Sequence, residues 1–290
     1  MKKTAVIAIS TGCLDYLELK KDNLFMVRCK ILMNDKQYDD FTGIDADTFY
    51  SALKKDPDLV PTSSMPSVGE VLKVYEQVEA AGYEDVLVIT ISKGLSGTFE
   101  SCLMAKNAYP GNLNIWVIHT KNAAISEGYI TLEALRLIDE GVDFESIKTY
   151  IKSLSLARKQ YFLVDNLRLL VKNGRLSGVQ GFLGGLLKIK PILQVNDEGK
   201  IVPFEKIRTK QKALDRMVEV VLEDLKNIND FVVTYNTSDN IDSYNYIKSK
   251  IDEVYPNHQH YSAPITPVIG CHTGHGTVGI AYFNLDLMKK

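Results

Sequence analysis

Two short segments of the sequence, each just before a predicted helix, are rich in hydroxyl side chains. The first cluster, TSSMPS at 62–67, precedes a helical pattern that begins near Val68, and the second, SKGLSGT at 92–98, directly follows an apolar run at 86–91. In a parallel α/β sheet, ligands collect at the carboxyl ends of the strands. Unpaired N–H groups at the start of a helix attract anions there. The two clusters therefore predict an anion site, with Ser96 as a hydroxyl donor.

Some of these hydroxyls also have a purely structural interpretation. Ser67 and Glu70 have the S-x-x-E spacing of a capping box, and Ser96 could serve only as the N-cap of the following helix. A capping role does not account for the hydroxyls of Thr62 and Ser63. Both interpretations of Ser96 stay open on the sequence alone.

A third polar segment, GCHTGHG at 270–276, is expected to be a glycine-rich loop. His272 and His275 stand three residues apart, and Cys271 is the one further metal-ligand type beside them. This pattern is a weak signal for a metal, since tetrahedral sites need more ligands at suitable spacing. We therefore predict no metal site, and we expect His272 to form a hydrogen bond with an anion or with another loop.

Two arginines lie in polar segments next to predicted turns. Arg175 occurs in KNGRLS, and Arg208 occurs in IRT before a helical pattern. Arginine can bind a carboxylate or a phosphate through two parallel hydrogen bonds. These residues are candidates for contact with a partner. The alternatives are an intramolecular ion pair or ordinary solvated surface charge.

Several motifs of common enzymes are absent from the sequence. The chain contains no GxxxxGK[ST], no HExxH, no GxGxxG after a strand and no GxSxG. A hydrolase that used Ser96 as its nucleophile would need one of the five histidines as a base. We predict a protein without catalytic residues and keep the serine hydrolase or acyltransferase as an alternative.

Apolar strands and helical patterns alternate in the first half of the chain. Such alternation predicts a parallel sheet with helices on both faces. The predicted strands are 5–9, 86–91 and 115–118, and the predicted helices are 67–82, 97–108, 122–140 and 143–157. The segment 24–42 has a turn at Asn34-Asp35 and is expected to be an inserted hairpin.

The second half has a different pattern, with adjacent strands joined by a tight turn and helices grouped after them. This order predicts an α+β domain. The predicted strands are 161–164, 189–195, 201–207, 230–235 and 277–283, the predicted helices are 166–171, 209–227 and 239–252, and a glycine-rich stretch contains Gly178, Gly181, Gly184 and Gly185. We place the boundary near 156–160, which gives an N-terminal α/β domain at 1–158 and a C-terminal α+β domain at 159–290.

Bulk composition narrows the class of protein. The 290 residues are 45% apolar and carry a formal net charge of -2, which gives no reason to expect nucleic acid as a partner. The four cysteines form no CxxC pair, so reduced thiols are expected. The start of the chain, MKKTAVIAIS, fits a first strand better than a signal peptide, and no apolar stretch approaches the roughly 20 residues that span a bilayer. We expect a cytoplasmic protein.

Six segments in the same order along the chain resemble the DegV family, the FakB-like fatty-acid-binding subunits of bacterial fatty acid kinase. The segments are TSSMPS (62–67), ISKGLSGTFES (91–101), FLVDNLRLLVKNGRLSG (162–178), LLKIKPIL (186–193), IRTKQKAL (207–214) and PVIGCHTGHG (267–276). The resemblance covers the chain nearly end to end. It implies a two-domain fold that buries a long-chain fatty acid such as hexadecanoate between the domains, with no other cofactor.

The resemblance also implies roles for individual residues. The carboxylate-binding hydroxyls correspond to Ser63 and Ser96, with Thr62 and His272 as further polar contacts. Arg175 and Arg208 correspond to positions near the carboxylate end, where the ATP-binding kinase subunit, a dihydroxyacetone-kinase-like protein, would dock. Two hydroxyls and helix-end N–H groups would hold a carboxylate without a buried cation. A lipid sensor without a kinase partner is a further alternative.

The sequence departs from the family pattern at several positions. Ile9 and His119 stand where aspartate is usual, Met65 stands where glutamine is usual, and His275 stands where proline is usual. The apolar hairpin segment of the family reads MVRCKIL here. We expect these differences to change the polar surroundings of the pocket more than the fold.

Overall fold

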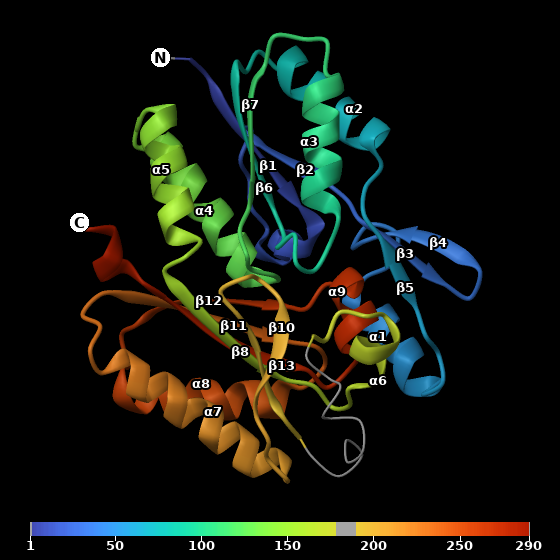
Figure 1. Cartoon of the computed structure of the whole chain (residues 1–290), viewed down its shortest axis with the longest axis vertical. Helices are drawn as coiled ribbons and strands as arrows, with labels where there is room; N and C mark the ends of the chain where they lie inside the picture. Colours follow the sequence, from blue (N-terminus) through green and yellow to red (C-terminus); the bar gives the residue numbers. More distant parts are fainter. Residues whose placement is uncertain (1, 178–189, 290) are drawn as a thin grey trace.

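A computed structural model describes residues 2–177 and 190–289 of the chain. It contains two large β-sheets, one above the other in Figure 1, and a small third sheet at their side. The predicted glycine-rich stretch at 178–185 lies outside the described residues.

The first large sheet is parallel and has helices on both faces, as predicted. In spatial order its strands are β2 (Leu24–Val27), β1 (Thr4–Ile9), β6 (Asp85–Thr90) and β7 (Asn114–His119). Helices α2 (Val68–Ala80) and α3 (Thr98–Ala108) cover one face, and α4 (Ile125–Asp139) and α5 (Phe144–Leu154) cover the other.

Alternate residues of one strand supply both hydrophobic cores. Ile7 of β1 packs in the cluster under α2 and α3, whereas Val6 packs in the cluster under α4 and α5. Because both faces are buried, the strands are apolar throughout, which is why the sequence identified them. The polar loops at their carboxyl ends point toward the second sheet (Figure 1).

The segment 24–42 differs from the single hairpin that we predicted. Its first strand, β2, pairs in parallel with β1 at the edge of the large sheet. The hairpin itself is β3 (Lys30–Met33) and β4 (Lys36–Asp39), closed by Asn34 and Asp35 at positive φ, and β5 (Thr62–Ser64) joins β3 to complete the third sheet. Helix α1 (Ala46–Lys55), which we did not predict, follows the hairpin.

The second large sheet is mixed. Its spatial order is β10 (Ile201–Glu205), β9 (Ile192–Val195), β8 (Arg158–Leu163), β13 (Val278–Asn284), β11 (Phe231–Thr237) and β12 (Gln259–Pro264), with a parallel β11–β12 pair among antiparallel neighbours. Helices α7 (Lys210–Leu225) and α8 (Ile241–Val254) cover its outer face. The opposite face meets α4, where Ser126 Oγ lies 2.8 Å from Thr234 Oγ1.

The fold class that the sequence predicted is confirmed: a parallel α/β sheet is followed by a second unit of strands and grouped helices. The boundary at 158/159 falls at the first residue of β8 and stays a prediction about independent domains. Short helices not yet named are α6 (Arg168–Lys172) and the 3-10 turns Ser10–Gly12, Leu14–Leu17 and Leu285–Met288.

The segment predicted as a third polar loop is largely helical. Residues Pro267–Thr273 form α9, and the glycine-rich turn begins only at Gly274. Tertiary contacts hold this short helix against α1. The carboxylate of Asp40 accepts hydrogen bonds from Thr266 Oγ1 at 2.7 Å and from the Val268 N–H at 3.1 Å, and the Tyr50 hydroxyl donates to the Ile265 carbonyl at 2.8 Å.

We expect Asp40→Ala to lower the free energy of unfolding by about 1–3 kcal/mol, because two buried donors lose their acceptor. Asp40→Asn retains an acceptor oxygen and should cost less. Asp47→Ala, at an exposed position in the first turn of α1, is the control and should change stability by about 0.5 kcal/mol or less. Urea denaturation measures all three variants. Equal stability of the two alanine variants would contradict the anchoring role of Asp40.

Candidate ligand-binding site

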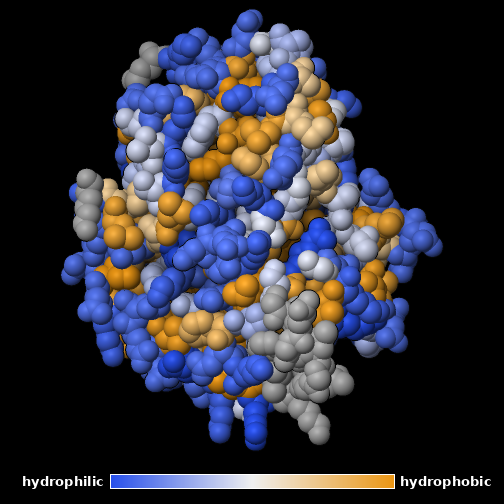
Figure 2. Space-filling view, viewed as in Figure 1, coloured by the Kyte–Doolittle hydropathy of each residue, from blue (hydrophilic) through white to orange (hydrophobic). Residues whose placement is uncertain are grey.

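A cavity of about 170 Å³ lies between the two large sheets. Both halves of the chain supply its wall. Much of the lining is apolar and comes from Ile91, Phe162, Val195, Ile201, Val268 and Ile269. The space-filling view shows apolar residues recessed in a hollow between the two lobes, beside a hydrophilic outer surface (Figure 2). Such a concave, largely apolar site is typical of small-molecule binding.

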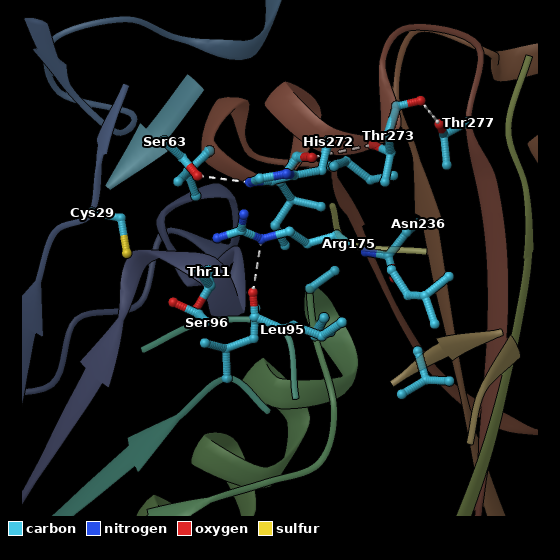
Figure 3. Close-up of a pocket in the computed structure, with 18 of the residues that line it drawn as sticks. Thr11, Cys29, Ser63, Leu95, Ser96, Arg175, Asn236, His272, Thr273 and Thr277 are labelled. Atoms are coloured by element: carbon cyan, nitrogen blue, oxygen red, sulfur yellow. Dashed lines mark hydrogen bonds between the residues drawn. The ribbon is translucent and has the colours of Figure 1, made fainter. Parts of the chain in front are cut away.

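Ser63 and His272 meet at one end of this cavity. Ser63 lies on β5 opposite Ile31 of β3, and His272 lies in the last turn of α9. Their side chains are joined by a hydrogen bond of 2.7 Å between Ser63 Oγ and His272 Nε2 (Figure 3). Because Asp40 fixes the start of α9, it also fixes the position of His272.

Ser96 lies at the same end of the cavity, in the turn after β6. The N-cap position of α3 is occupied by Gly97 and has no side-chain cap. Ser96 Oγ accepts a hydrogen bond from the Thr98 N–H at 3.3 Å and lies 2.8 Å from Thr98 Oγ1. Ser96 therefore stabilises the start of the helix and also lines the cavity, so its two interpretations are compatible.

The structure places a cation among these hydroxyls, which the sequence analysis did not expect. The guanidinium of Arg175 extends between Ser63 and Ser96 (Figure 3). Its Nε donates to the Leu95 carbonyl at 3.3 Å and its Nη1 donates to the Asn173 carbonyl at 2.7 Å. Within 2–177 and 190–289, no carboxylate lies within ion-pair distance of Arg175. An anionic ligand would supply the missing counter-charge.

His272 is neutral at physiological pH. Burial, and secondarily the positive charge of Arg175, lower the pKa of His272 to about 4. Its Nδ1 is buried and has no hydrogen-bond partner in the described part of the protein. His272 can therefore orient Ser63 through Nε2, while the positive charge at this end of the cavity belongs to Arg175.

Two of the predicted site residues lie elsewhere. Thr62 is exposed and does not line the cavity, although its carbonyl accepts a hydrogen bond from Cys271 Sγ at 3.6 Å. Arg208 is exposed just before Thr209, the N-cap of α7, and is also outside the cavity. The structure thus brings together Ser63, Ser96 and His272, with Arg175 facing the cavity instead of the outer surface.

The residues that depart from the family pattern lie in different parts of the structure. Met65 lines the cavity and is 50% exposed, so this end of the cavity reaches the surface. Ile9 is fully buried in the core under α2 and α3. His119 packs edge-on against Phe99 at a ring distance of 5.0 Å, and neither His119 nor His275 lines the cavity.

Several polar residues of the lining were missed by the sequence analysis, among them Thr11, Gln160 and Asn236. Gln160 and Asn236 lie inside strands β8 and β11, where a polar side chain at an inward position was the available signal. Thr11 follows β1 and donates to Glu127 Oε1 at 2.8 Å. Burial raises the pKa of Glu127 well above its ordinary value, which favours the uncharged carboxyl.

Three further expectations concern the capping box, a metal site and a membrane-spanning helix. The capping box is confirmed: Ser67 Oγ accepts from the Glu70 N–H at 3.3 Å, and Glu70 Oε2 accepts from the Ser67 N–H at 2.8 Å. A search of the same residues finds no group of three or more His, Cys, Asp or Glu side chains positioned for a metal ion. Nor does any helix in the described ranges have the length and apolar character needed to cross a membrane.

The fold and the site together define a class of α/β protein in which a cavity between two sheets has an apolar wall and one cationic, hydroxyl-rich end. The chain belongs to the DegV family, described as uncharacterised proteins, whose model matches residues 3–285. It is 32% identical over 279 residues to protein DegV of Bacillus subtilis, covering 96% of this chain and 98% of that protein. A DegV domain-containing protein of Clostridium acetobutylicum is 32% identical over 285 residues, covering 98% and 99%.

Solved structures show the same fold over the whole chain. DegV of Bacillus subtilis, described as a fatty acid binding protein, is 30% identical with a TM-score of 0.88, covering 98% of this chain and 100% of that one. A fatty acid binding DegV family protein of Streptococcus agalactiae is 29% identical with a TM-score of 0.89, covering 98% and 99%.

His272 gives the site a testable pH dependence. Since the pKa of His272 is lowered from 6.5 to about 4 in the folded protein, the unfolded chain takes up its proton first as the pH falls. Stability is therefore lost between about pH 6.5 and pH 4. Relative to His272→Asn, the wild type should lose roughly 3 kcal/mol more between pH 7 and pH 4. Denaturant titrations at several pH values measure this difference, and a difference that stays constant with pH would contradict the assignment.

Proposed function

We propose that the chain binds one long-chain fatty acid in this cavity, with the carboxylate at the Arg175 end, and presents it to a fatty acid kinase. The observation that carries the binding is the convergence of Ser63, Ser96 and Arg175, an arginine without a carboxylate partner among the described residues, at one end of an apolar cavity. The two solved relatives described as fatty acid binding proteins support the same ligand.

Head and tail contribute differently to this binding. Burying the acyl tail contributes about 0.8 kcal/mol for each CH₂ group, or roughly 10 kcal/mol before ordering costs for a tail of about sixteen carbons. The carboxylate is charged and needs donors when it leaves water. In the proposed complex, His272 Nε2–H donates to Ser63 Oγ, which leaves the Ser63 hydroxyl proton for the carboxylate. Arg175 supplies charge-assisted hydrogen bonds.

Access to the carboxylate supports the presentation step. Ser64 and Met65 line the head-group end of the cavity and are both exposed at the surface. A partner that phosphorylates the carboxylate could therefore reach it without unfolding the carrier. The exposed Arg208 provides a charge with which such a partner, or the phosphate of its nucleotide, could pair.

One observation favours the alternative of a serine hydrolase, namely the hydrogen bond between Ser63 and His272. A catalytic histidine is normally oriented by a third group at its other ring nitrogen. His272 Nδ1 has no such partner among the described residues, and a pKa of about 4 makes this imidazole a weak base at neutral pH. Ser96, the nucleophile considered from the sequence, is paired with Thr98 and not with a histidine. The carrier accounts for the site better.

The carboxylate assignment is tested by fatty acid affinity. We expect Ser63→Ala and Ser96→Ala each to weaken binding by roughly 1.5–3 kcal/mol, or about ten- to a hundred-fold, and Arg175→Met to weaken it at least as much. The costs should not add, because the groups share one ligand. Native mass spectrometry should show about one fatty acid on the wild type. Ser51→Ala, exposed on α1, is the control. Wild-type affinity in a Ser63/Ser96 double variant would contradict the proposed site.

The role of Arg208 is tested by reconstitution with the kinase and ATP. Arg208→Ala should leave the melting temperature and the fatty acid affinity unchanged and should lower acyl-phosphate formation about ten-fold, because a paired charge at the interface is lost. Lys212→Ala removes a nearby exposed charge in the first turn of α7 and is the control for a general electrostatic effect. Equal turnover by wild type and Arg208→Ala would remove this residue from the proposed interface.

A further inference from the structure

Two buried amide side chains line the cavity on the face of the second large sheet. Asn236 of β11 lies in register with Gly279 of β13, and Gly279 lies in register with Phe162 of β8. Gln160 precedes Phe162 by two residues, so its side chain extends from the same face. Gln160, Phe162, Asn236 and Gly279 all line the cavity. An apolar acyl tail alone gives no reason for amides at this position.

Each amide has at least one buried polar atom without a partner among the described residues. Asn236 is 5% exposed and Gln160 is 8% exposed. Gln160 Nε2 donates to the Ala123 carbonyl at 3.3 Å, whereas Gln160 Oε1 and Asn236 Nδ2 have no hydrogen-bond partner among the residues that the structure describes. Buried amide groups are nearly always paired in native proteins, because leaving one unpaired is costly. The sheet thus presents a free donor, Asn236 Nδ2, and a free acceptor, Gln160 Oε1.

The neighbouring hydroxyls on this side of the cavity are already donating. Thr277 Oγ1 donates to the Thr273 carbonyl at 3.1 Å, and Thr273 Oγ1 donates to the Ile269 carbonyl at 3.4 Å. Their protons are therefore not available to a ligand, whereas the Nδ2–H group of Asn236 is. Among these groups, the free donor on this side of the cavity is therefore the amide of Asn236.

These amides are separate from the head-group site. Figure 3 shows Asn236 on the other side of the cavity from Ser63 and Ser96, with Arg175 between them. A ligand whose carboxylate lies at Arg175 would therefore meet Asn236 with its tail. Gly279 keeps the sheet open at this point, since a Cβ there would lie 3.2 Å from Phe162 Cβ and 4.0 Å from Asn236 Cβ.

Given the proposed fatty acid binding, we infer that the site is built for an oxygenated long-chain fatty acid, with a hydroxyl group along its tail. A hydroxyl oxygen accepts from Asn236 Nδ2 and its proton can go to Gln160 Oε1, so this substituent has the two roles that the amides require. A keto oxygen can only accept a hydrogen bond, so it would pair with Asn236 Nδ2 and leave Gln160 Oε1 without a partner. An unsubstituted tail would bury both amide atoms without partners, and the protein would then discriminate against it.

The test compares the dissociation constants of stearic acid and of three monohydroxystearic acids, which are isomers that carry the hydroxyl near the carboxylate, in mid-chain or near the methyl end. We expect one isomer to bind the wild type about ten-fold more tightly than stearic acid. Asn236→Leu, which is similar in shape, should abolish this preference and retain or strengthen stearic acid binding. The keto acid with its oxygen at the same position is measured as well. Gln160→Met should reduce the preference for the hydroxy acid over stearic acid more than it reduces the preference for the keto acid over stearic acid.

The outcomes separate this inference from the proposed function. If stearic acid binds and no isomer is preferred, or if the preference survives in Asn236→Leu, the amides pair with water and the inference is wrong. If neither stearic acid nor any isomer binds, the proposed fatty acid function fails as well. If thermal melting shows that the variants do not fold, the wild-type protein alone tests the inference, through its affinity for the hydroxystearic acids relative to stearic acid.

Discussion

The hydrogen bonds that the buried carboxylate of Asp40 accepts hold the binding site together. They join the end of the β3–β4 hairpin, early in the chain, to the start of α9, more than two hundred residues later. Through α9 they set the position of His272, which in turn contacts Ser63 on the strand beside the hairpin. The price of this arrangement is a carboxyl group in the core, where burial raises its pKa to about 6. The site is thus assembled from segments that are remote in sequence and fixed by a few polar contacts.

The ionisable groups around the cavity are arranged so that the positive charge of Arg175 remains available to a ligand. In the part of the chain that the structure describes, Arg175 is held by backbone carbonyls and not by a carboxylate. His272 beside it is kept neutral, and burial favours the uncharged form of Glu127, which accepts a hydrogen bond from Thr11. Backbone carbonyls fix the direction of a guanidinium without cancelling its charge, which distinguishes this arrangement from a structural ion pair.

The sequence predicts those features that depend on local pattern. The apolar strands β1, β6 and β7 and the capping box of α2 are visible in it, because burial on both faces and helix capping each leave a short-range signature. The sequence predicts a loop where α9 lies, because glycines such as Gly270 and Gly274 usually interrupt helices. In the structure, Gly270 fits closely against Phe49 and Tyr50 of α1, where a Cβ would lie within 2.7 Å of either ring side chain.

Other features depend on contacts that a linear pattern does not contain. The inward direction of Arg175 rests on the carbonyl of Leu95, eighty residues earlier, so turn-adjacent position alone suggested a surface role. The amides of Gln160 and Asn236 meet one cavity only because β8 and β11 flank β13 in the same sheet. Strand order of this kind follows from the whole chain and not from any single strand.

The position of α9 also limits how the protein can be recombined. By sequence this helix belongs to the second half, yet Ile265, Val268 and Cys271 pack in the hydrophobic core of the first. The two halves are therefore not exchangeable modules. A chimaera that joined residues 1–158 of this chain to the second half of a relative would insert a foreign helix into the first core and replace the partner of Ser63 at the same time. Substitutions in the hairpin, in α1 and in α9 are consequently constrained to change together.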